Sequence, residues 1–433
     1  MKPLINFWQK KGMCKMSDLQ NFKSKKPYFK ETDYTVSRFK KSMNPNVSII
    51  LPTYNKKNEL TLTLQSLECQ MFSKRGFEAV VCDDGSNDGT EAIRFSEFSF
   101  PITYIRSNKN IGRPSIRNLG IRNASADVLI FLDSEIAVKP DFIEKHYEAH
   151  LHHDKLVVCG SMVLHGVFAR YDPKFNEDQK KILLEVMKED ENQLKAIRNA
   201  MEQKIPLQLL DRDDIHNQTF QNRSFEKPFV KIYRNTIFRE FGDHLTGFHF
   251  PWLLFCTGNV SVKSAAILEA GLFEEYPGYG WDDHEMGYRL YKRGYSFFNH
   301  TGLVAFHQEH PIAKSNPLDA RKNFVRVYQK YPDIQLRVFA LHFIGITLLE
   351  LNEVYKAYLT FIEKQPEYWT EISQLFVHML DQIASKLWKG ESLTKLAEGC
   401  DAAIFNTSRL SHPLLKEEKI RPFAELLRKM IYL

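Results

Sequence analysis

The sequence lacks the marks of several protein classes. Its six cysteines are scattered and form no CxxC pair, which argues against a disulfide framework and a cysteine-based zinc site. The longest apolar stretch, residues 338–351, is interrupted by His342 and is too short to span a membrane, so it predicts a buried helix. No small-residue cleavage site follows an apolar run near the N-terminus. We therefore expect reduced thiols and a cytoplasmic protein.

Glycine-rich phosphate loops and nucleic-acid patches are also absent. No G-x-G-x-x-G motif follows the first predicted strand, which disfavours a dinucleotide-binding oxidoreductase. No basic patch with interleaved aromatic residues recurs in the body of the chain, so no nucleic-acid partner is expected.

Positive charge is concentrated at the N-terminus. Residues 1–46 carry ten lysines and one arginine against three acidic residues, a net charge of +8, whereas the whole chain carries +6. Residues 1–45 therefore form a basic arm. One interpretation is a solvated segment, and the other is a peripheral contact with an acceptor or with the anionic inner face of a membrane.

The body of the chain is globular and alternates strand and helix patterns. A hydrophobic content of 43% with 13% aromatic residues predicts a packed core. The strand patterns span 46–55, 77–83, 102–107 and 127–133, and helix patterns span 56–72 and 112–124. Asp88 is placed to cap a further helix after the second strand. This order predicts an α/β fold, a mostly parallel sheet with helices on both faces.

Polar clusters follow three of these strands, at Pro52–Asn55, Asp83-Asp84 and Asp133–Glu135. The carboxyl ends of parallel strands share one edge of a sheet, where ligands bind. Carboxylates two residues apart suit Mg²⁺ or Mn²⁺ together with substrate phosphates. The alternative is that Asp133 caps the next turn and Glu135 is exposed. The nearby carboxylates favour the metal site, because burying several of them without a cation or donors is costly.

Four sequence blocks occur in order between about residues 46 and 160. They are "SIILPTYN", "VVCDDGSNDGT", "NIGRPSIRNLGI" and "ADVLIFLDSEIAVKPDFIEKH". Together they resemble the family 2 glycosyltransferases, which have the Rossmann-like GT-A fold. The resemblance implies a nucleotide-sugar donor, usually a UDP-sugar, and Mn²⁺ or Mg²⁺ on its diphosphate.

The resemblance also implies roles for single residues. Asp84 would bind the uracil edge, Asp83 would support that loop, and Arg113 would lie near the base or diphosphate. Asp133 and Glu135 take the D-x-D positions, where glutamate departs from the family pattern. The complete donor-binding set is Pro52, Tyr54, Asn55, Asp83, Asp84, Arg113, Ser134, Gly258, Asn259 and Trp281.

A second block, residues 257–297, places acidic residues at the start of a predicted helix. It resembles the carboxyl-terminal catalytic segment of galactosyltransferase-like and chondroitin-polymerase-like GT-A enzymes, roughly W-G-x-E-D-x-E, with Asp282-Asp283 as the acidic pair. Asp283 is the candidate general base, Asp282 would orient the loop, and Glu285 is the next carboxylate to consider. Alternatively, these acids only cap the helix. Glu285 and Arg289 are spaced to form an ion pair.

A histidine completes the predicted metal site. His307, in "GLVAFHQEHP", occupies the place where related enzymes put a metal-binding histidine, and His310 is the rival ligand. Imidazole suits Mn²⁺ better than Mg²⁺.

The chain divides into three predicted regions. The basic arm (1–45) precedes a GT-A catalytic domain (46–311), which a helical region (312–433) follows. Within the catalytic domain, the insertion 165–250 is read as an acceptor-facing lid, with a packed helical hairpin without a substrate role as the alternative. The carboxyl-terminal helices either pack on the catalytic domain or form a homodimer.

These features predict a metal-dependent inverting glycosyltransferase. The acceptor would be a glycan, a lipid-linked sugar or a peptide. A sugar-nucleotide nucleotidylyltransferase is disfavoured, because "PTYNKKNE" lacks the glycines of a triphosphate-binding loop. A catalytically inactive glycan-binding or scaffold protein would have lost the acidic residues, which are present here.

Overall fold

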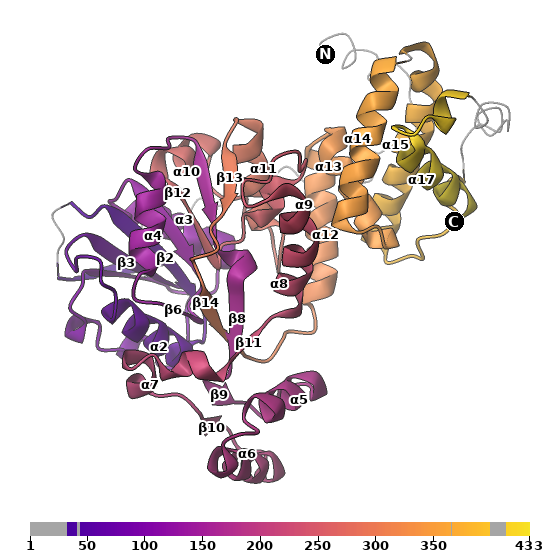
Figure 1. Cartoon of the computed structure of the whole chain (residues 1–433). Coiled ribbons are helices and arrows are strands. Elements are labelled where there is room, and N and C mark those ends of the chain that lie inside the picture. Colours follow the sequence, from indigo (N-terminus) through magenta and orange to yellow (C-terminus); the bar gives the residue numbers. More distant parts are fainter. Residues whose placement is uncertain (1–32, 41–43, 365, 399–412) are drawn as a thin grey trace.

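The computed structural model describes residues 33–40, 44–364, 366–398 and 413–433. At its centre lies an eight-stranded sheet of order β1-β4-β3-β2-β5-β12-β7-β13 (Figure 1). Its strands are β1 (Tyr34–Phe39), β2 (Val47–Thr53), β3 (Phe77–Asp83), β4 (Ile102–Ser107), β5 (Val128–Leu132), β7 (Leu156–Cys159), β12 (Asn259–Lys263) and β13 (Ser296–Asn299). Only β1 and β12 run antiparallel to their neighbours, which confirms the predicted mostly parallel sheet.

Helices cover both faces of this sheet, as predicted. Alternate residues of a strand point to opposite faces. Ile49 and Leu51 of β2 share a core with Leu60 and Leu64 of α2 (Lys57–Glu68). Ile50 instead belongs to the core that contains α3 (Arg113–Asn123). The same alternation places α4 (Phe142–His150) in the first core and α10 (Ser264–Ala270) in the second.

The predicted helix between β3 and β4 is wrong. The chain there forms two short 3-10 turns, η3 (Thr90–Ala92) and η4 (Phe95–Glu97). Asp88 caps no α-helix after it. Its Oδ1 accepts from the amide of Thr90 at 3.1 Å, at the start of η3. Its Oδ2 accepts a hydrogen bond of 2.8 Å from the amide of Lys57 and so satisfies a free donor at the start of α2.

Two longer helix predictions are also divided in the structure. The pattern at 178–203 forms α5 (Glu177–Val186) and α6 (Glu191–Gln203), because the Asp190 side chain accepts from the amide of Gln193 and starts a new helix. The apolar stretch 338–351 forms the 3-10 helix η9 (Val338–Ile344) and the start of α14 (Leu348–Lys364), and Gly345 between them has a φ of 88°.

A second sheet of four strands lies beside the end of β5. Its order is β11-β8-β14-β6, with β6 (Ile136–Val138), β8 (Leu164–Val167), β11 (Ser224–Glu226) and β14 (Ala305–Gln308). Because β6 follows β5 after only three residues, the register of β14 against β6 sets His307 opposite Ile136. This pairing brings a residue from late in the chain to the carboxyl end of β5.

The insertion divides into a projecting part and a part that packs against the body. Helices α5 and α6, with the short strands β9 (Arg170–Tyr171) and β10 (Leu207–Gln208), extend from the lower edge of the molecule in Figure 1. They enclose a small core of their own that includes Leu183 and Ile197. The rest comprises α7 (Arg212–His216), η6 (Thr219–Arg223), α8 (Pro228–Tyr233), the π-helical turn Arg234–Phe238 and α9 (Arg239–Phe241).

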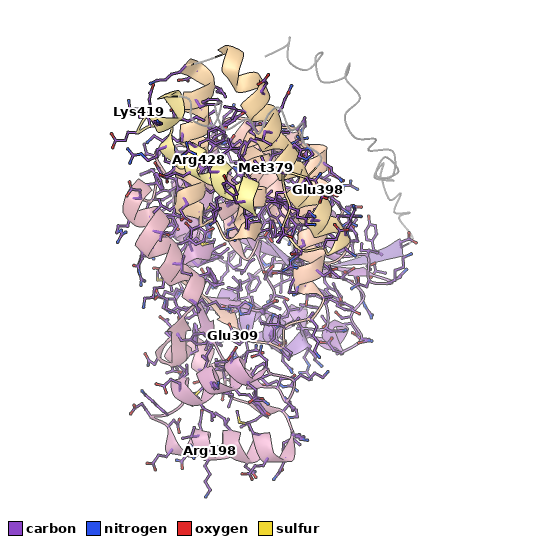
Figure 2. The ribbon with its side chains drawn as sticks, turned by 90° about the vertical axis from the view of Figure 1, so that its right-hand side faces the viewer. Arg198, Glu309, Met379, Glu398, Lys419 and Arg428 are labelled. Atoms are coloured by element: carbon purple, nitrogen blue, oxygen red, sulfur yellow. The ribbon has the colours of Figure 1, made fainter. Side chains whose placement is uncertain are left out.

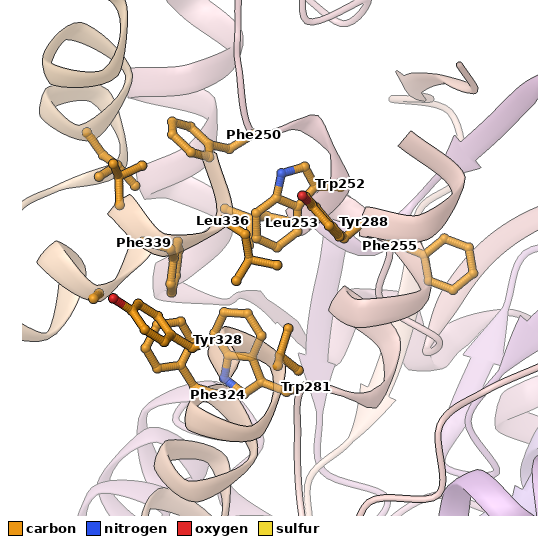
Figure 3. Close-up of a cluster of buried hydrophobic side chains, with 14 of the residues drawn as sticks. Phe250, Trp252, Leu253, Phe255, Trp281, Tyr288, Phe324, Tyr328, Leu336 and Phe339 are labelled. Carbon is orange, nitrogen blue, oxygen red and sulfur yellow. The ribbon is translucent and has the colours of Figure 1, made fainter. Parts of the chain in front are cut away.

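The carboxyl-terminal region is helical and packs on the α/β part of the chain. It comprises α12 (Asn316–Lys330), α13 (Ile334–Arg337), η9, α14, α15 (Pro366–Lys389), η10 (Pro413–Lys416) and α17 (Arg421–Tyr432). Figure 3 shows its aromatic side chains around Trp281. The Trp281 ring lies 4.8 Å from that of Phe324 and 5.1 Å from that of Phe339, centre to centre. In Figure 2, Arg198 of α6 and Met379 of α15 lie towards opposite ends of the molecule, and Glu309 lies between them.

Most of the predicted basic arm, residues 1–32 and 41–43, lies outside the described residues, whereas residues 34–39 form edge strand β1. Among the described helices, none combines the length and apolar character of a membrane span.

Candidate active site

A cavity of about 310 Å³ lies where the carboxyl end of β5 meets the start of α11 (Asp282–Lys292). Six of its lining residues were predicted site residues that the sequence scatters over almost 200 positions. These are Arg113, Asp133, Gly258, Trp281, Asp283 and His307. The remaining walls include Ser161, Met162, Phe229, Cys256, Thr257, Tyr279, Gly280 and His284.

Asp133 enters the cavity directly after β5. A side-chain carbon at position 258 would lie 3.1 Å from its Oδ2, so the glycine there allows the carboxylate its close packing. Burial, followed by the nearby charge of Glu135, raises the pKa of Asp133 above its usual range. A neighbouring cation would stabilise the ionised form of a carboxyl group buried in this way.

Glu135, His307 and His310 form a compact group of potential metal ligands. One atom from each side chain lies within 4.8 Å of the others. His310 Nε2 lies 3.3 Å from Glu135 Oε1, and Ser134 Oγ donates to Glu135 Oε2 at 3.0 Å. Burial alone would raise the pKa of Glu135, but the hydrogen bond from His310 and the positive charge of Lys56 hold it well below its usual range.

In both histidines, Nδ1 contacts an oxygen atom outside this group of potential ligands. His307 Nδ1 lies 2.9 Å from Glu309 Oε1, and the same carboxylate oxygen pairs with Lys227 at 2.6 Å. His310 Nδ1 lies 3.0 Å from the carbonyl oxygen of Pro311. For His307, such a partner holds the proton on Nδ1 and leaves Nε2 as a ligand atom, which is the usual arrangement around a metal. His310 has an acceptor at each ring nitrogen, the carbonyl oxygen of Pro311 and Glu135 Oε1, so the two rival histidines differ. The oxygen and nitrogen donors of the group fit Mn²⁺.

Asp282 is held by a buried ion pair. Its Oδ2 lies 2.7 Å from Arg117 Nη1, and its Oδ1 lies 3.4 Å from Arg113 Nη2. Arg117 also donates to Thr257 Oγ1 at 2.8 Å and stacks over the ring of Phe273. Burial alone would raise the pKa of Asp282, but the two guanidinium groups lower it to about 2. Asp282 is thus a fixed anion that joins α3 to α11.

Asp283 is the neighbouring carboxylate that remains open to the cavity. Its Oδ1 accepts a hydrogen bond from the amide of His284, and its side chain is 19% exposed. Trp281, immediately before α11, has a φ of 71°, which is unusual for a bulky residue. Backbone strain of this kind is typical of sites where the surroundings fix a functional side chain.

Glu285 does not serve as a further candidate base. It is fully buried, and its carboxylate pairs with Arg289 at 2.8 Å, with Lys330 at 2.8 Å and with the hydroxyl of Tyr331. The predicted pair with Arg289 is confirmed. Glu285 therefore joins α11 to α12.

The predicted nucleotide-binding residues cluster at the ends of β2 and β3, outside the cavity lining. Asp84 accepts from the amides of Ile111 and Gly112 at 2.6 and 3.0 Å. Burial is the largest effect on this carboxyl and raises the pKa of Asp84 to about 6. Asp83 is buried and accepts from the amide of Ser86 at 2.8 Å, so it shapes the loop as expected.

The remaining members of the nucleotide set differ in exposure. Asn55 Oδ1 accepts from the amide of Asn87, which joins the β2 and β3 loops. Tyr54 is 46% exposed beside it, whereas Pro52 is buried within β2.

Asn259 is not brought to the cavity. Its side chain is fully buried, its Oδ1 lies 3.0 Å from His146 Nε2, and its Nδ2 donates to the carbonyl of Leu303. We therefore interpret Asn259 as a structural residue that anchors α4 to β12.

Sequence reasoning missed residues whose importance depends on contacts between distant segments. Arg117 had a local signal, because it follows Arg113 by four positions and so lies on the same helix face. Glu309 follows His307 by two positions, which places both on one face of a strand. Asn323 of α12 had no local sequence signal. Its Nδ2 donates to the carbonyls of Pro277, Tyr279 and Gly280 at 3.0 to 3.2 Å. These bonds fix the loop before Trp281.

The sequence is similar to those of known proteins. Residues 48–227 match the family model described as Glycosyl transferase family 2. An uncharacterized glycosyltransferase of Bacillus subtilis strain 168, YfnE, is 35% identical over 292 residues, 66% of this chain and 71% of that protein. The chondroitin synthase of Escherichia coli is 30% identical over 294 residues, 66% of this chain but only 38% of the synthase.

One solved structure is similar over most of the chain. It is a mannosyltransferase of Pyrobaculum calidifontis in complex with GDP-Man and Mn²⁺, at a TM-score of 0.42 and 14% identity, and the match covers 90% of this chain and 86% of that one.

Proposed function

Because the chain belongs to glycosyltransferase family 2, we propose that it is a metal-dependent inverting glycosyltransferase that transfers a sugar from a UDP-sugar to an acceptor hydroxyl. The observation that carries this proposal is the convergence of Asp133, His307 and Asp283 on one cavity that also receives Arg113.

The donor would extend from the nucleotide loops to the cavity. The uracil edge meets Asp84, and the diphosphate lies towards Asp133 and Arg113. Asp133 and Glu135, with His307 or His310, would hold Mn²⁺ or Mg²⁺. When bound, the ion offsets negative charge on the departing nucleoside diphosphate. Arg113 adds a positive charge to the same cavity.

Asp283 is proposed as the general base. The acceptor hydroxyl must lose its proton as it attacks the anomeric carbon, and Asp283 is a carboxylate that faces the cavity without a buried ion pair to arginine. Asp282 and Arg117 hold the first turn of α11 and so position Asp283. A single displacement, with the base opposite the leaving group, inverts the anomeric centre.

The acceptor class is proposed more broadly, as a glycan, a lipid-linked sugar or a peptide. Phe229 of the insertion lines the cavity and is 37% exposed, and the Tyr279 ring beside Arg113 is 44% exposed. This supports the view that the second part of the insertion contributes to the acceptor side.

The metal role is tested by comparing Asp133→Asn and Glu135→Gln with the wild type in a screen of UDP-, GDP- and dTDP-sugars for metal-dependent nucleotide release. Loss of one metal or diphosphate contact should lower turnover at least ~100-fold while the fold stays intact. Asp178→Asn, an exposed residue of α5, is the matched control. Full activity of the two variants in the presence of chelator would disprove the metal role.

A further inference from the structure

A second group of potential metal ligands lies in the same cavity. Cys256, Asp283 and His284 each offer one ligand atom, and these atoms lie within 4.8 Å of one another. Cys256 precedes β12, whereas the other two residues lie in the first turn of α11. All three line the cavity, so an ion can reach them from the space proposed for the substrates.

The histidine of this group has an unused nitrogen. His284 Nδ1 is buried and has no hydrogen-bond partner among the described residues. It lies 4.0 Å from Asp283 Oδ1, beyond hydrogen-bond distance. A buried polar atom usually has a partner, and an ion between these side chains would supply one.

The donor set differs in kind from the first group. Glu135, His307 and His310 offer oxygen and nitrogen atoms, which suit Mn²⁺. A thiolate, an imidazole and a carboxylate are the ligands of Zn²⁺, and three protein ligands leave a fourth position open to water or another molecule. The Cys256 group therefore favours a different metal from the Glu135 group, of which His307 also lines the cavity.

We propose that Cys256, Asp283 and His284 form a Zn²⁺ site, and that Zn²⁺ bound there inhibits sugar transfer. Binding replaces the proton of the Cys256 thiol with the metal and releases that proton to solvent. The ion occupies a lone pair of Asp283, so this carboxylate no longer accepts a proton from the acceptor. The inhibition rests on the proposed function, whereas metal binding does not.

Binding is tested on the full chain with Co²⁺ as a spectroscopic substitute for Zn²⁺. A thiolate ligand gives a sulfur-to-cobalt charge-transfer band, which an ion at the Glu135 group cannot produce. The wild type should show this band, and Zn²⁺ should abolish it by displacement. Cys256→Ser should lack the band, and His284→Gln should bind at least ~10-fold more weakly. Cys69→Ser removes a partly exposed thiol outside the group and should keep the band.

The results separate the two halves of the proposal. A wild type without the band, a band that survives Cys256→Ser, or one that disappears in Cys69→Ser would overturn the site. Inhibition is measured as Zn²⁺ titrations of UDP release with Mn²⁺ present, each variant relative to its own zinc-free rate. Cys256→Ser should need at least ~10-fold more Zn²⁺ for half-inhibition. If the wild type and Cys256→Ser need the same Zn²⁺ concentration for half-inhibition, the proposed inhibition is overturned. A chain that binds Co²⁺ through the thiolate but transfers no sugar would refute only the proposed function.

Discussion

Arg117 Nη1 lies 2.7 Å from Asp282 Oδ2, and both side chains are buried. The pair joins α3, which follows the nucleotide loops, to the turn that carries Asp283. Arg113 of the same helix also pairs with Asp282, at 3.4 Å, so two ion pairs hold the two sides of the proposed site together. This makes Asp282 a positioning residue for its neighbour.

Asp282→Asn should destabilise the protein more than its small size change suggests. Removing one partner leaves the Arg117 guanidinium buried without a counter-charge, at a cost of about 3–5 kcal/mol in the free energy of unfolding. Urea denaturation measures this cost. Asp154→Asn breaks an exposed ion pair with Lys263 and should leave the unfolding midpoint unchanged. Equal midpoints for Asp282→Asn and the wild type would contradict the structural role of the pair.

Asn323→Asp should lower turnover through the loop that precedes α11. The substitution keeps the shape but replaces a donor with a carboxylate that faces three carbonyl oxygens. Loss of these bonds should reduce kcat about tenfold or more, because small displacements at an active site are costly. Gln329→Glu makes the same chemical change at an exposed position of α12 and should have no effect. Identical kinetics for both variants would show that α12 does not position the loop.

The fold and the family were predictable because their signals are local. Alternating apolar residues and the polar ends of three strands lie within short stretches, and they identified β2, β3, β5 and their convergence. Asp133 and Asp283 could be named because each stands in a recognisable block. The absence of an α-helix after β3 could not be predicted. Asp88 has the character of a helix cap, but it bonds to α2, a segment 31 positions away.

The rest of the site depends on pairings between distant segments. Asn259 stands in the predicted catalytic block, but only the packing of α4 against β12 shows that its amide is used by His146. The separation of roles between Asp282 and Asp283 likewise follows from Arg117, 165 residues earlier. Asp282 and Asp283 are adjacent and identical, so the sequence alone does not distinguish the ion-paired carboxylate from the one that faces the cavity.

Two buried histidines should make the protein sensitive to acid. His146 and His150 both bond to Ser261 Oγ, and burial lowers their pKa values to about 3 and 4. Below the ordinary pKa of about 6.5 the unfolded chain takes up protons that the folded protein does not, so stability falls as pH falls. Each histidine contributes a slope that approaches about 1.4 kcal/mol per pH unit near pH 5, where the unfolded chain is protonated at this position and the folded protein is not.

This slope is measured by urea denaturation at several pH values. His150→Gln should lose its share of the dependence, and the exposed His152→Gln should keep the wild-type slope. If the unfolding free energy of His150→Gln falls with pH as steeply as that of the wild type, buried His150 is not a source of the acid sensitivity.

Donor binding should weaken in acid because of Asp84. Burial raises the pKa of this carboxyl to about 6, so below that pH it is mostly neutral and becomes a much weaker acceptor for the uracil N–H. The dissociation constant of a UDP-sugar should rise about tenfold per pH unit below 6. Asp84→Asn should bind more weakly and without this dependence. Calorimetric titration between pH 5 and 7 measures both, and a flat wild-type profile would exclude this role for Asp84.

The most direct test of the proposed mechanism is a comparison of Asp283→Asn with the wild type, in which acceptor glycosylation and UDP-sugar affinity are measured on the same protein. Asparagine keeps the size of the side chain but cannot take a proton. We predict that glycosylation falls about 10²–10⁴-fold while donor affinity is unchanged, because the base acts on the acceptor alone. A variant that folds, binds donor and glycosylates at the wild-type rate would contradict the account.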